Sequence, residues 1–199
     1  MASEKIIVIA STNQNKVKEI KKYYPSLNFK SLKDLSITDE VVEDGKTFKE
    51  NAIKKASYIA KKYQVVTIAD DSGLCCLALN KEPGVYSARY ASDHNDNLNN
   101  LKLVKNMKDK KNKKAYYEAS ICLALPNGRV YTKSKKCYGY IILEPRGNNG
   151  FGYDPYFYLP KFKKTMAELT IDEKNQISHR AKALKSLKHI LKRITRKWN

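Results

Sequence analysis

The sequence predicts an α/β protein built on a mixed β-sheet, and two patterns carry this prediction. From residue 5 to residue 71, apolar strand-like runs alternate with amphipathic helical segments in the order strand, helix, short strand, helix, strand. Later, residues 114–125 and 129–142 have the pattern of two strands joined by the turn Pro126-Asn127-Gly128, a hairpin that makes the sheet mixed. In such folds ligands bind beyond the carboxyl ends of the strands, so we expect the site residues there.

Length and composition fit a single domain over residues 1–199, with one core or two lobes that share a sheet. No apolar run approaches the roughly 18 residues of a membrane span, and the first one is too short for a signal peptide. The four cysteines lack Cys-x-x-Cys spacing and three lie in apolar runs, which favours buried free thiols. We therefore expect a cytoplasmic protein with no membrane partner.

The formal charge of +19 is concentrated in two segments. Residues 101–114 carry a net charge of +6 and residues 180–199 a net charge of +8. Such runs are usually solvated Lys-rich faces, but they can also steer a polyanionic small substrate. Charge alone does not distinguish a nucleotide from RNA as the ligand.

The first strand, residues 5–10, leads through a polar turn into a helix with Val17, Ile20 and Tyr24 on one face. A strand, a polar turn and a helix start together form an anion-binding arrangement, to which Lys16 adds a mobile positive charge. The turn is not a Walker loop, because Gly-x-x-x-x-Gly-Lys is absent. The alternative is an ordinary Asn-rich helix cap.

An acidic loop, residues 39–45, precedes the second helix. Thr47 and Glu50 have the spacing of a capping box, with Thr47 as the N-cap. The buried face expected for this helix consists of Phe48, Ala52, Ala56, Ile59 and Tyr63.

The next strand runs into two adjacent carboxylates. Residues 65–68 form a β-branched apolar run that leads to Asp70 and Asp71, and we expect the strand to end at the turn Ser72-Gly73. Neighbouring carboxylates repel each other, so a metal ion, a basic neighbour, a raised pKa or water must compensate. Taken alone, this segment is typical of a solvated turn.

The middle of the chain offers fewer site candidates. Residues 74–79 have the pattern of another strand, and the turn after Pro83 presents Arg89 beside aromatic residues, either solvated or in contact with a phosphate or base. Residues 95–107 predict a helix, followed by a Lys-rich surface loop. Its expected buried face is Leu98, Leu101, Val104 and Met107.

A glycine-rich loop occupies residues 145–155. Its glycines permit close approach of the backbone, while Phe151 and Tyr153 offer flat faces for a base. Such a loop is more specific than a turn between strands requires, so we interpret it as a binding loop.

Two helices follow with polar starts. A second capping box, residues 170–173, begins a short helix that carries Lys174, and Ser178 caps the last helix, whose first turn holds His179 and Arg180. These cationic side chains at a helix N-terminus can clamp an anionic ligand or a base carbonyl, although a lone His is more often structural. The expected buried face of the last helix is Leu184, Leu187, Leu191, Ile194 and Trp198.

These segments, taken in order, resemble one enzyme family over nearly the whole chain: the inosine triphosphate pyrophosphatases, which remove deaminated purine nucleotides. The matching motifs are Ser11-Thr12-Asn13-x-x-Lys16, Thr47-Phe48-x-Glu50-Asn51-Ala52, Ala69-Asp70-Asp71-Ser72-Gly73, Gly84-Val85-Tyr86-Ser87-Ala88-Arg89-Tyr90, Phe151-Gly152-Tyr153-Asp154-Pro155, Ala167-Glu168-Leu169 and Ser178-His179-Arg180. The resemblance implies an elongated mixed sheet flanked by helices, two lobes around a nucleotide cleft, and a homodimer. It also implies Mg²⁺-dependent hydrolysis of ITP, dITP and XTP to the monophosphate and pyrophosphate.

The resemblance further implies roles for particular residues. The substrate-binding residues would be Ser11, Thr12, Asn13, Lys16, Asn51, Ser72, Arg89, Phe151, Gly152, Tyr153, Asp154, Lys174, His179 and Arg180. Of these, Thr12, Asn13 and Lys16 would hold the triphosphate, and the set from Phe151 onward would bind base and sugar. Donors on the last helix suit the 6-carbonyl of inosine and xanthine, because an adenine amino group would leave them unpaired.

The acidic residues would form the metal end of the site. Asp71 would be both metal ligand and general base, with Asp70 as support or an auxiliary metal contact. Glu43 is the best match to the family's second acidic ligand, and Glu40 is its rival. A triphosphate carries about four negative charges, so carboxylates can face it only through a divalent cation such as Mg²⁺.

Two other functions remain to be compared with this one. A nucleic-acid-binding protein could use the two Lys-rich segments, but no RRM or helix-turn-helix signature is found. A related pyrophosphatase could instead prefer modified pyrimidine nucleotides. We expect a purine nucleoside triphosphate as the ligand, and we do not expect nucleic-acid binding as the main function.

Overall fold

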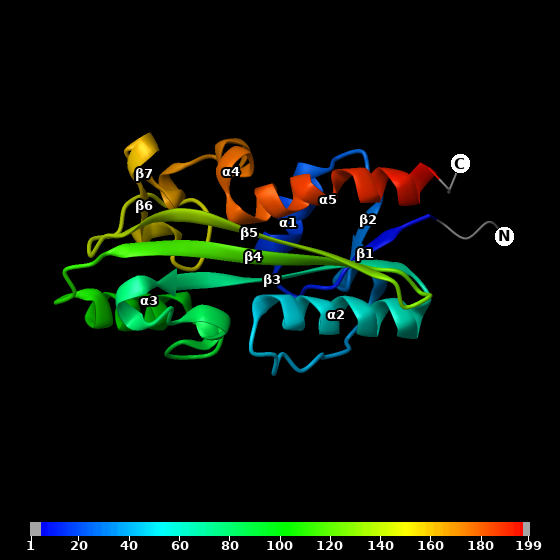
Figure 1. Ribbon diagram of the computed structural model, residues 1–199, viewed down its shortest axis with the longest axis horizontal. Coiled ribbons are helices and arrows are strands. Elements are labelled where there is room, and N and C mark those ends of the chain that lie inside the picture. The colour runs from blue at the N-terminus through cyan, green and yellow to red at the C-terminus, as the bar shows by residue number, and fades with distance from the viewer. Residues whose placement is uncertain (1–4, 197–199) are drawn as a thin grey trace. The chain divides into compact units, whose positions relative to one another are not determined.

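The computed structural model describes residues 5–196 and contains, within this range, a mixed sheet of seven strands in the order β2-β1-β3-β4-β5-β6-β7 (Figure 1). The strands are β1 (Ile7–Ile9), β2 (Phe29–Ser31), β3 (Val66–Cys76), β4 (Lys114–Ala124), β5 (Val130–Ile141), β6 (Phe157–Leu159) and β7 (Lys164–Thr165). The helices are α1 (Gln14–Tyr23), α2 (Phe48–Tyr63), α3 (Asp96–Met107), α4 (Ile171–Ile177) and α5 (His179–Arg196). The α/β class is confirmed, because β1 pairs in parallel with β2 and β3 whereas β6 pairs antiparallel with β5 and β7.

The chain divides into two compact units. Among the described residues, unit 1 comprises residues 5–71, 120–134 and 180–196, and unit 2 comprises residues 72–119 and 135–179.

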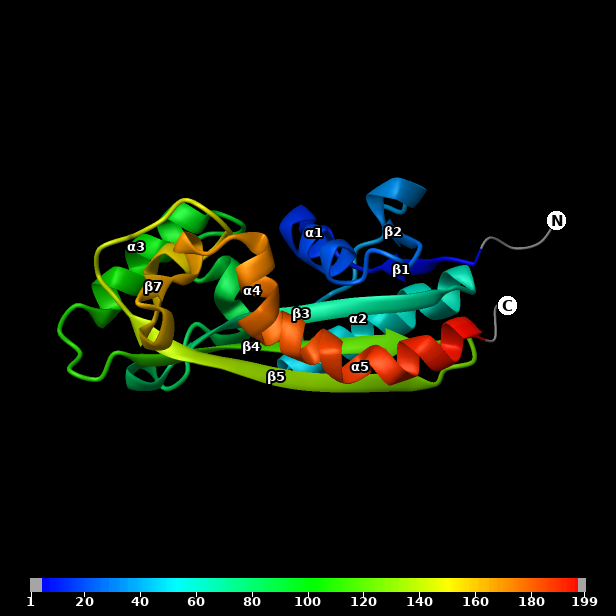
Figure 2. The same ribbon diagram turned by 90° about the horizontal axis from the view of Figure 1, so that it is seen from above.

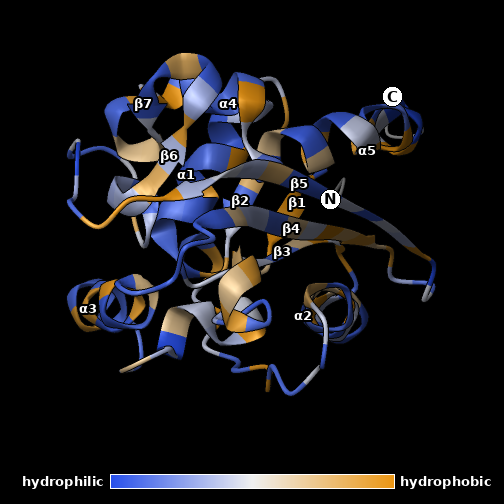
Figure 3. Ribbon diagram, turned by 60° about the vertical axis from the view of Figure 1, so that its left-hand side comes forward, coloured by the Kyte–Doolittle hydropathy of each residue, from blue (hydrophilic) through white to orange (hydrophobic). Residues whose placement is uncertain are grey.

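Unit 1 has a layered core in which helices cover both faces of the sheet. Alternate residues of a strand point to opposite faces, so Ile7 and Ile9 pack toward α1 and α5, while Val8 packs toward α2. Seen from above, α5 lies in front of the strands and α2 behind them (Figure 2), and hydrophobic residues colour the strands between these helices (Figure 3). The α5 residues Leu184, Leu187 and Leu191 are buried as predicted, and Ile194 packs partly buried beside them. Trp198, expected on the same face, lies outside the described residues.

Unit 2 has its own core, to which β3, β4, β5, β6 and α3 contribute. The core residues include Leu74, Cys76, Leu103, Met107, Tyr117, Cys137, Ile141, Tyr153 and Phe157. All four cysteines of the chain are buried and free, as expected. Between residues 5 and 196, no helix is long and apolar enough to cross a membrane.

The starts of α2 and α4 follow the predicted caps. Thr47 accepts a hydrogen bond from the Glu50 N–H at 3.2 Å while the Glu50 carboxylate accepts from the Thr47 N–H at 3.2 Å, so both orphan donors are satisfied. The same reciprocal pair joins Thr170 and Glu173 at the start of α4. Each cap of this kind stabilises a helix by about 1 kcal/mol.

The predicted turn at Ser72-Gly73 is wrong, because β3 continues without interruption through both residues to Cys76. Gly73 is needed for a close contact and not for a turn: a Cβ there would lie 2.2 Å from Ser87 Oγ. The Ser87 hydroxyl oxygen accepts a hydrogen bond from the Leu74 N–H at 2.9 Å, which requires this approach. The predicted strand 74–79 is therefore the end of β3 followed by a 3-10 turn, Leu77–Leu79.

The predicted buried face of α3 is also wrong in part. Leu98 and Leu101 are 45% and 63% exposed, whereas Asn99 and Asn100 are buried. The Asn99 side chain accepts from the Ala91 N–H at 2.7 Å, and Asn100 donates to the Gly152 carbonyl at 3.0 Å. Polar groups of loops therefore orient this helix more than its apolar spacing does.

Candidate functional site

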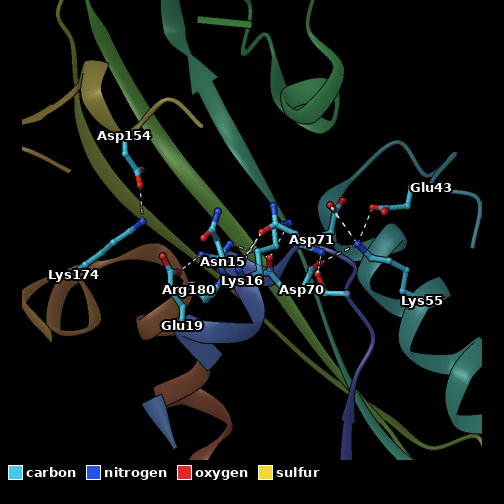
Figure 4. A network of polar contacts seen from close by, with 12 residues as sticks. Asn15, Lys16, Glu19, Glu43, Lys55, Asp70, Asp71, Asp154, Lys174 and Arg180 are labelled. Atoms are coloured by element: carbon cyan, nitrogen blue, oxygen red, sulfur yellow. Dashed lines mark hydrogen bonds and ion pairs between the residues drawn. The ribbon is translucent and has the colours of Figure 1, made fainter. Parts of the chain in front are cut away.

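The central residues of the candidate site are Asp70 and Asp71, which are adjacent on β3 but have different surroundings (Figure 4). Consecutive side chains on a strand point to opposite faces, so Asp70 and Asp71 are directed apart. Asp70 is 0% exposed and Asp71 is 7% exposed. Both belong to unit 1.

Asp70 lies in a buried ion-pair network. Its carboxylate is 3.1 Å from the Arg180 guanidinium and 3.0 Å from Lys16 Nζ, and Arg180 also pairs with Glu19. Burial alone would raise the pKa of Asp70, but the charges and hydrogen bonds of Arg180 and Lys16 hold it well below its usual range. Asp70 is therefore ionised at neutral pH and links β3 to α1 and α5.

This network bears on two of the sequence predictions. Asp70 was expected as support or an auxiliary metal contact; its carboxylate pairs with two cations, and both expected roles stay predictions. Arg180 was expected to bind the base, whereas its guanidinium, 2% exposed, pairs with acids of unit 1. Its contact with a base stays a prediction.

Asp71 lies beside Glu43 and Lys55. Burial raises the pKa of Asp71 to about 6, with Glu43 adding to the rise, while the positive charges of Lys55 and Lys16 limit it. Lys55 Nζ is 2.8 Å from Glu43 Oε2, 3.0 Å from the Asp70 carbonyl oxygen and 3.8 Å from Asp71 Oδ1 (Figure 4). For Glu43, burial would raise the pKa, but Lys55, together with Lys16 and a hydrogen bond with Asp71, holds the pKa below its ordinary value.

Lys55 is the residue of this site that sequence reasoning missed. It lies one helical turn after Asn51 on α2, so both side chains lie on the same face of the helix. That i, i+4 spacing from a residue in a matched motif was the available signal. A lysine on a helix is usually solvated, which is why it did not stand out.

The structure brings Glu43, and not Glu40, to Asp71. Glu43 and Asp71 affect each other's pKa, whereas Glu40 is exposed. The loop that carries Glu43 is held by Asn51, whose side-chain oxygen accepts from the Gly45 N–H at 2.8 Å. A Cβ at Gly45 would lie 2.5 Å from that oxygen, so this approach requires glycine. A hydrogen bond with Asn51 also lowers the pKa of Asp71, so Asn51 contacts both Asp71 and the loop that carries Glu43.

The donor set of this acidic end fits Mg²⁺. Glu43, Asp71 and the Asp70 carbonyl supply hard oxygen atoms, which Mg²⁺ prefers. Within residues 5–196, no group of three or more His, Cys, Asp or Glu side chains could hold a metal ion. A cation here would therefore need further oxygen ligands from water or phosphate, the usual pattern for Mg²⁺.

The polar loop before α1 is largely ordered by its own contacts. The Asn13 side chain accepts from the N–H groups of Asn15 at 3.0 Å and Lys16 at 3.1 Å, and Ser11 Oγ accepts from the Asn13 N–H at 3.3 Å. Asn13 is thus an N-cap, as the alternative interpretation expected. Thr12 is exposed at this turn and Lys16 is partly buried beside Asp70.

Unit 2 brings together three of the residues predicted to bind the base, Phe151, Asp154 and Lys174. Asp154 and Lys174 form a buried ion pair at 2.6 Å, and Lys174 Nζ lies 4.8 Å from the centre of the Phe151 ring. Asp154 also accepts from the Phe151 N–H at 3.0 Å. Gly150 has φ +78°, and a Cβ there would lie 2.1 Å from Asp154 Oδ2, so glycine is required at this position.

Other predicted residues of unit 2 have different environments. Tyr153, expected to offer a flat face, is buried in the core and donates its hydroxyl to the Ser87 carbonyl at 2.8 Å. Arg89 is exposed and lies over the Tyr86 ring at 5.3 Å. His179 is buried and stacks on Tyr117, with ring centroids 4.8 Å apart and planes 10° apart. The remaining two, Ser72 and Gly152, are partly buried.

An α/β sheet on which carboxylates of β3 meet cations of α1, α2 and α5 is typical of proteins that bind phosphorylated ligands. Comparison with protein families makes this specific. A model of the Ham1 family matches residues 7–190, and the chain belongs to this family.

Relatives and solved structures agree with this assignment. A protein of Clostridium perfringens is 46% identical over 201 residues, covering 96% of this chain and 98% of the relative, and one of Bacillus subtilis is 45% identical over 189 residues, covering 92% and 96%. Both relatives are named dITP/XTP pyrophosphatase. The Staphylococcus aureus Ham1 structure has a TM-score of 0.85 at 41% identity, and the Coxiella burnetii HAM1 structure 0.84 at 39%; each covers 94% of this chain and 98% of its own. They confirm the fold class.

Proposed function

We propose that the protein is a Mg²⁺-dependent nucleoside triphosphate pyrophosphohydrolase that cleaves ITP, dITP and XTP to the monophosphate and pyrophosphate. The observation that carries this proposal is Asp71, a buried carboxylate with a pKa of about 6 beside Glu43 and Lys55. Membership of the Ham1 family and relatives named dITP/XTP pyrophosphatase support the substrate class.

In this reaction a water oxygen attacks the α-phosphorus, and the bond from that phosphorus to the bridging oxygen of the pyrophosphate breaks. Asp71 accepts the proton of the water, and a pKa near neutrality suits a general base. Lys55 and Lys16 lie close enough to the two aspartates to offset the charge of a bound polyphosphate. When bound, Mg²⁺ would offset charge on the departing pyrophosphate. Glu43 and Asp71 would hold it.

The predicted binding residues have different roles in this proposal. Thr12, Asn13 and Lys16 are assigned to the triphosphate, and Ser11, Asn51, Ser72 and Arg89 are further binding residues. Base and sugar are assigned to Phe151, Gly152, Tyr153, Asp154, Lys174, His179 and Arg180. Hydrogen-bond donors among these residues match the 6-carbonyl of hypoxanthine and xanthine, and adenine would leave such donors unpaired.

Separating the products of ITP incubated with the protein and Mg²⁺ tests the proposal. We expect IMP and pyrophosphate in equal amounts, and IDP with orthophosphate would overturn it. Parallel incubations with ATP, dUTP and a modified UTP test the substrate class, and faster turnover of the pyrimidines would reject it. We also propose a cytoplasmic homodimer, and light scattering after size-exclusion chromatography tests the oligomeric state.

A further inference from the structure

We propose that Tyr117 is a positioning residue for base recognition, because one buried side chain of β4 contacts His179 and neighbours the Asp154–Lys174 pair. The inference rests on the proposed function, in which His179 and Lys174 contact the base. Tyr117 itself is not expected to touch the substrate.

The first observation is the stacked pair of rings. Tyr117 and His179 have centroids 4.8 Å apart and planes 10° apart, and a second ring, that of Phe157, has its centroid 4.7 Å from that of Tyr117 with a tilt of 54°. The torsion that turns an imidazole ring is broad, so a histidine ring needs outside contacts to fix its plane. A flat partner held in the core supplies that contact.

The second observation concerns the other end of Tyr117. Burial, followed by the nearby Asp154 carboxylate, raises the pKa of the Tyr117 phenol well above its ordinary value, so the hydroxyl keeps its proton. The same carboxylate accepts from Lys174 Nζ at 2.6 Å and from the Phe151 N–H at 3.0 Å. Tyr117 therefore neighbours the group that places both Lys174 and the Phe151 loop.

Together these contacts couple two elements that are distant in sequence. His179 is at the start of α5, and Asp154 is in the glycine-rich loop, yet both adjoin Tyr117. A change at Tyr117 should therefore affect how well the base is distinguished, and should affect the hydrolysis of the phosphate chain less. A residue that only filled the core would slow all substrates equally.

Two substitutions separate the contribution of the Tyr117 ring from that of its hydroxyl, and Tyr116→Phe is the matched control. Tyr117→Phe keeps the stacked ring and removes the hydroxyl, while Tyr117→Leu removes both. Tyr116 is the neighbouring buried tyrosine of β4, and its ring lies 5.7 Å from that of Tyr138. The ratio of kcat/KM for ITP to that for ATP is measured for each variant, together with the melting temperature.

We expect the ITP to ATP ratio to fall about 3- to 10-fold in Tyr117→Phe, because the lost hydrogen bond to the Asp154 carboxylate acts on the base only through Lys174 and the Phe151 loop. It should fall about 10- to 100-fold in Tyr117→Leu, where the aromatic contact is lost as well. The ratio in Tyr116→Phe should stay within about twofold of the wild type. Equal losses for ITP and ATP in Tyr117→Phe, or an unchanged ratio, would overturn the proposal even if Tyr117→Leu fails to fold.

A second readout does not depend on turnover. The chain has three histidines, so the imidazole proton signals can be assigned by His179→Gln and followed by NMR. We expect the His179 signals to be shifted upfield by the tyrosine ring in the wild type and in Tyr117→Phe, and to return toward the ordinary position in Tyr117→Leu. An unshifted wild-type signal would contradict the stacked geometry. If the signals behave as expected but ITP is not hydrolysed, the proposed function fails and the positioning geometry stands.

Discussion

Removing the Arg180 side chain charge should destabilise the protein strongly, because it would leave two buried carboxylates without their guanidinium partner. Arg180→Met keeps an aliphatic stem at this position, while the pairs with Asp70 and Glu19 are lost. Breaking a buried ion pair from one side costs about 3–5 kcal/mol. Asp70 keeps Lys16 at 3.0 Å, which places the expected loss toward the lower part of that range.

The free energy of unfolding is measured by urea denaturation at neutral pH, with Lys185→Met as the control. Lys185 is an exposed lysine on the same helix, so its replacement should change stability by no more than about 0.5 kcal/mol. For a chain of this length, the loss in Arg180→Met corresponds to a fall in Tm of about 6–20 °C. A loss below about 1 kcal/mol would refute the reasoning that these carboxylates depend on Arg180.

The pH dependence of the same variant provides an independent check. Because the pKa of Asp70 in the folded protein is below its unfolded value of about 3.9, its ionisation stabilises the wild type above about pH 4, and this contribution is lost as the pH falls further. Without Arg180 the pKa of Asp70 in the folded protein rises. On acidification the variant therefore loses less of its free energy of unfolding than the wild type does. The difference in stability between the two proteins should therefore narrow as the pH falls below about pH 4. A difference that stays constant over this range would contradict the assignment.

Four further predictions concern the acidic end of the site and the start of α2. Asp71→Asn should lower kcat for ITP by about 10²- to 10⁴-fold in a steady-state assay, because the general base is lost. Since burial raises the pKa of Asp71 to about 6, its protonation should weaken Mg²⁺ binding about tenfold at about pH 5 relative to about pH 7 in calorimetric titrations; equal affinities would contradict this. Glu43→Gln should weaken Mg²⁺ binding in the same titrations. Glu40→Gln, at an exposed position of the same loop, is the control and should leave Mg²⁺ binding unchanged. Thr47→Ala should lower the free energy of unfolding by about 0.5–2 kcal/mol in urea, because the capping box is lost.

Local patterns allowed much of the fold to be predicted. The capping boxes at Thr47 and Thr170 depend on residues three positions apart, and the structure has both. The hairpin of β4 and β5 likewise depends on a short turn signal, and the Gly128 N–H donates to the Leu125 carbonyl at 3.0 Å within it. Features specified within a few residues of each other are therefore visible in the sequence.

The errors arose where distant segments decide the structure. Gly73 was interpreted as a turn, but its contact with Ser87 explains the glycine and lets the strand continue. The apolar spacing of α3 pointed to Leu98 and Leu101, whereas the helix buries the amide of Asn99, whose partners lie on a preceding loop. Such contacts leave no periodic signal in the local sequence.

The candidate site shows the same division. Asp71 and Glu43 could be selected because acidic residues after a strand and in a matched loop are conspicuous. Lys55 could not, because its importance comes from lying within 3.0 Å of the Asp70 carbonyl and beside Glu43. The pairing of Asp70 with Arg180 likewise joins residues 110 positions apart in the chain.

The loop that carries Glu43 is tied at both sides of that residue to α2. Before Glu43, the Asp39 carboxylate accepts from the Tyr58 hydroxyl at 2.8 Å and also pairs with Lys62 and Tyr63; after it, the Gly45 N–H donates to Asn51. The conformational freedom of this loop is therefore lost when the chain folds, before any ligand arrives. A cation that binds Glu43 need not order the loop, so less of its binding free energy is spent on chain entropy. The contacts of Asp39 with Tyr58, Lys62 and Tyr63 thus preorganise the loop that carries Glu43, although these three residues lie near the other end of α2 from the site.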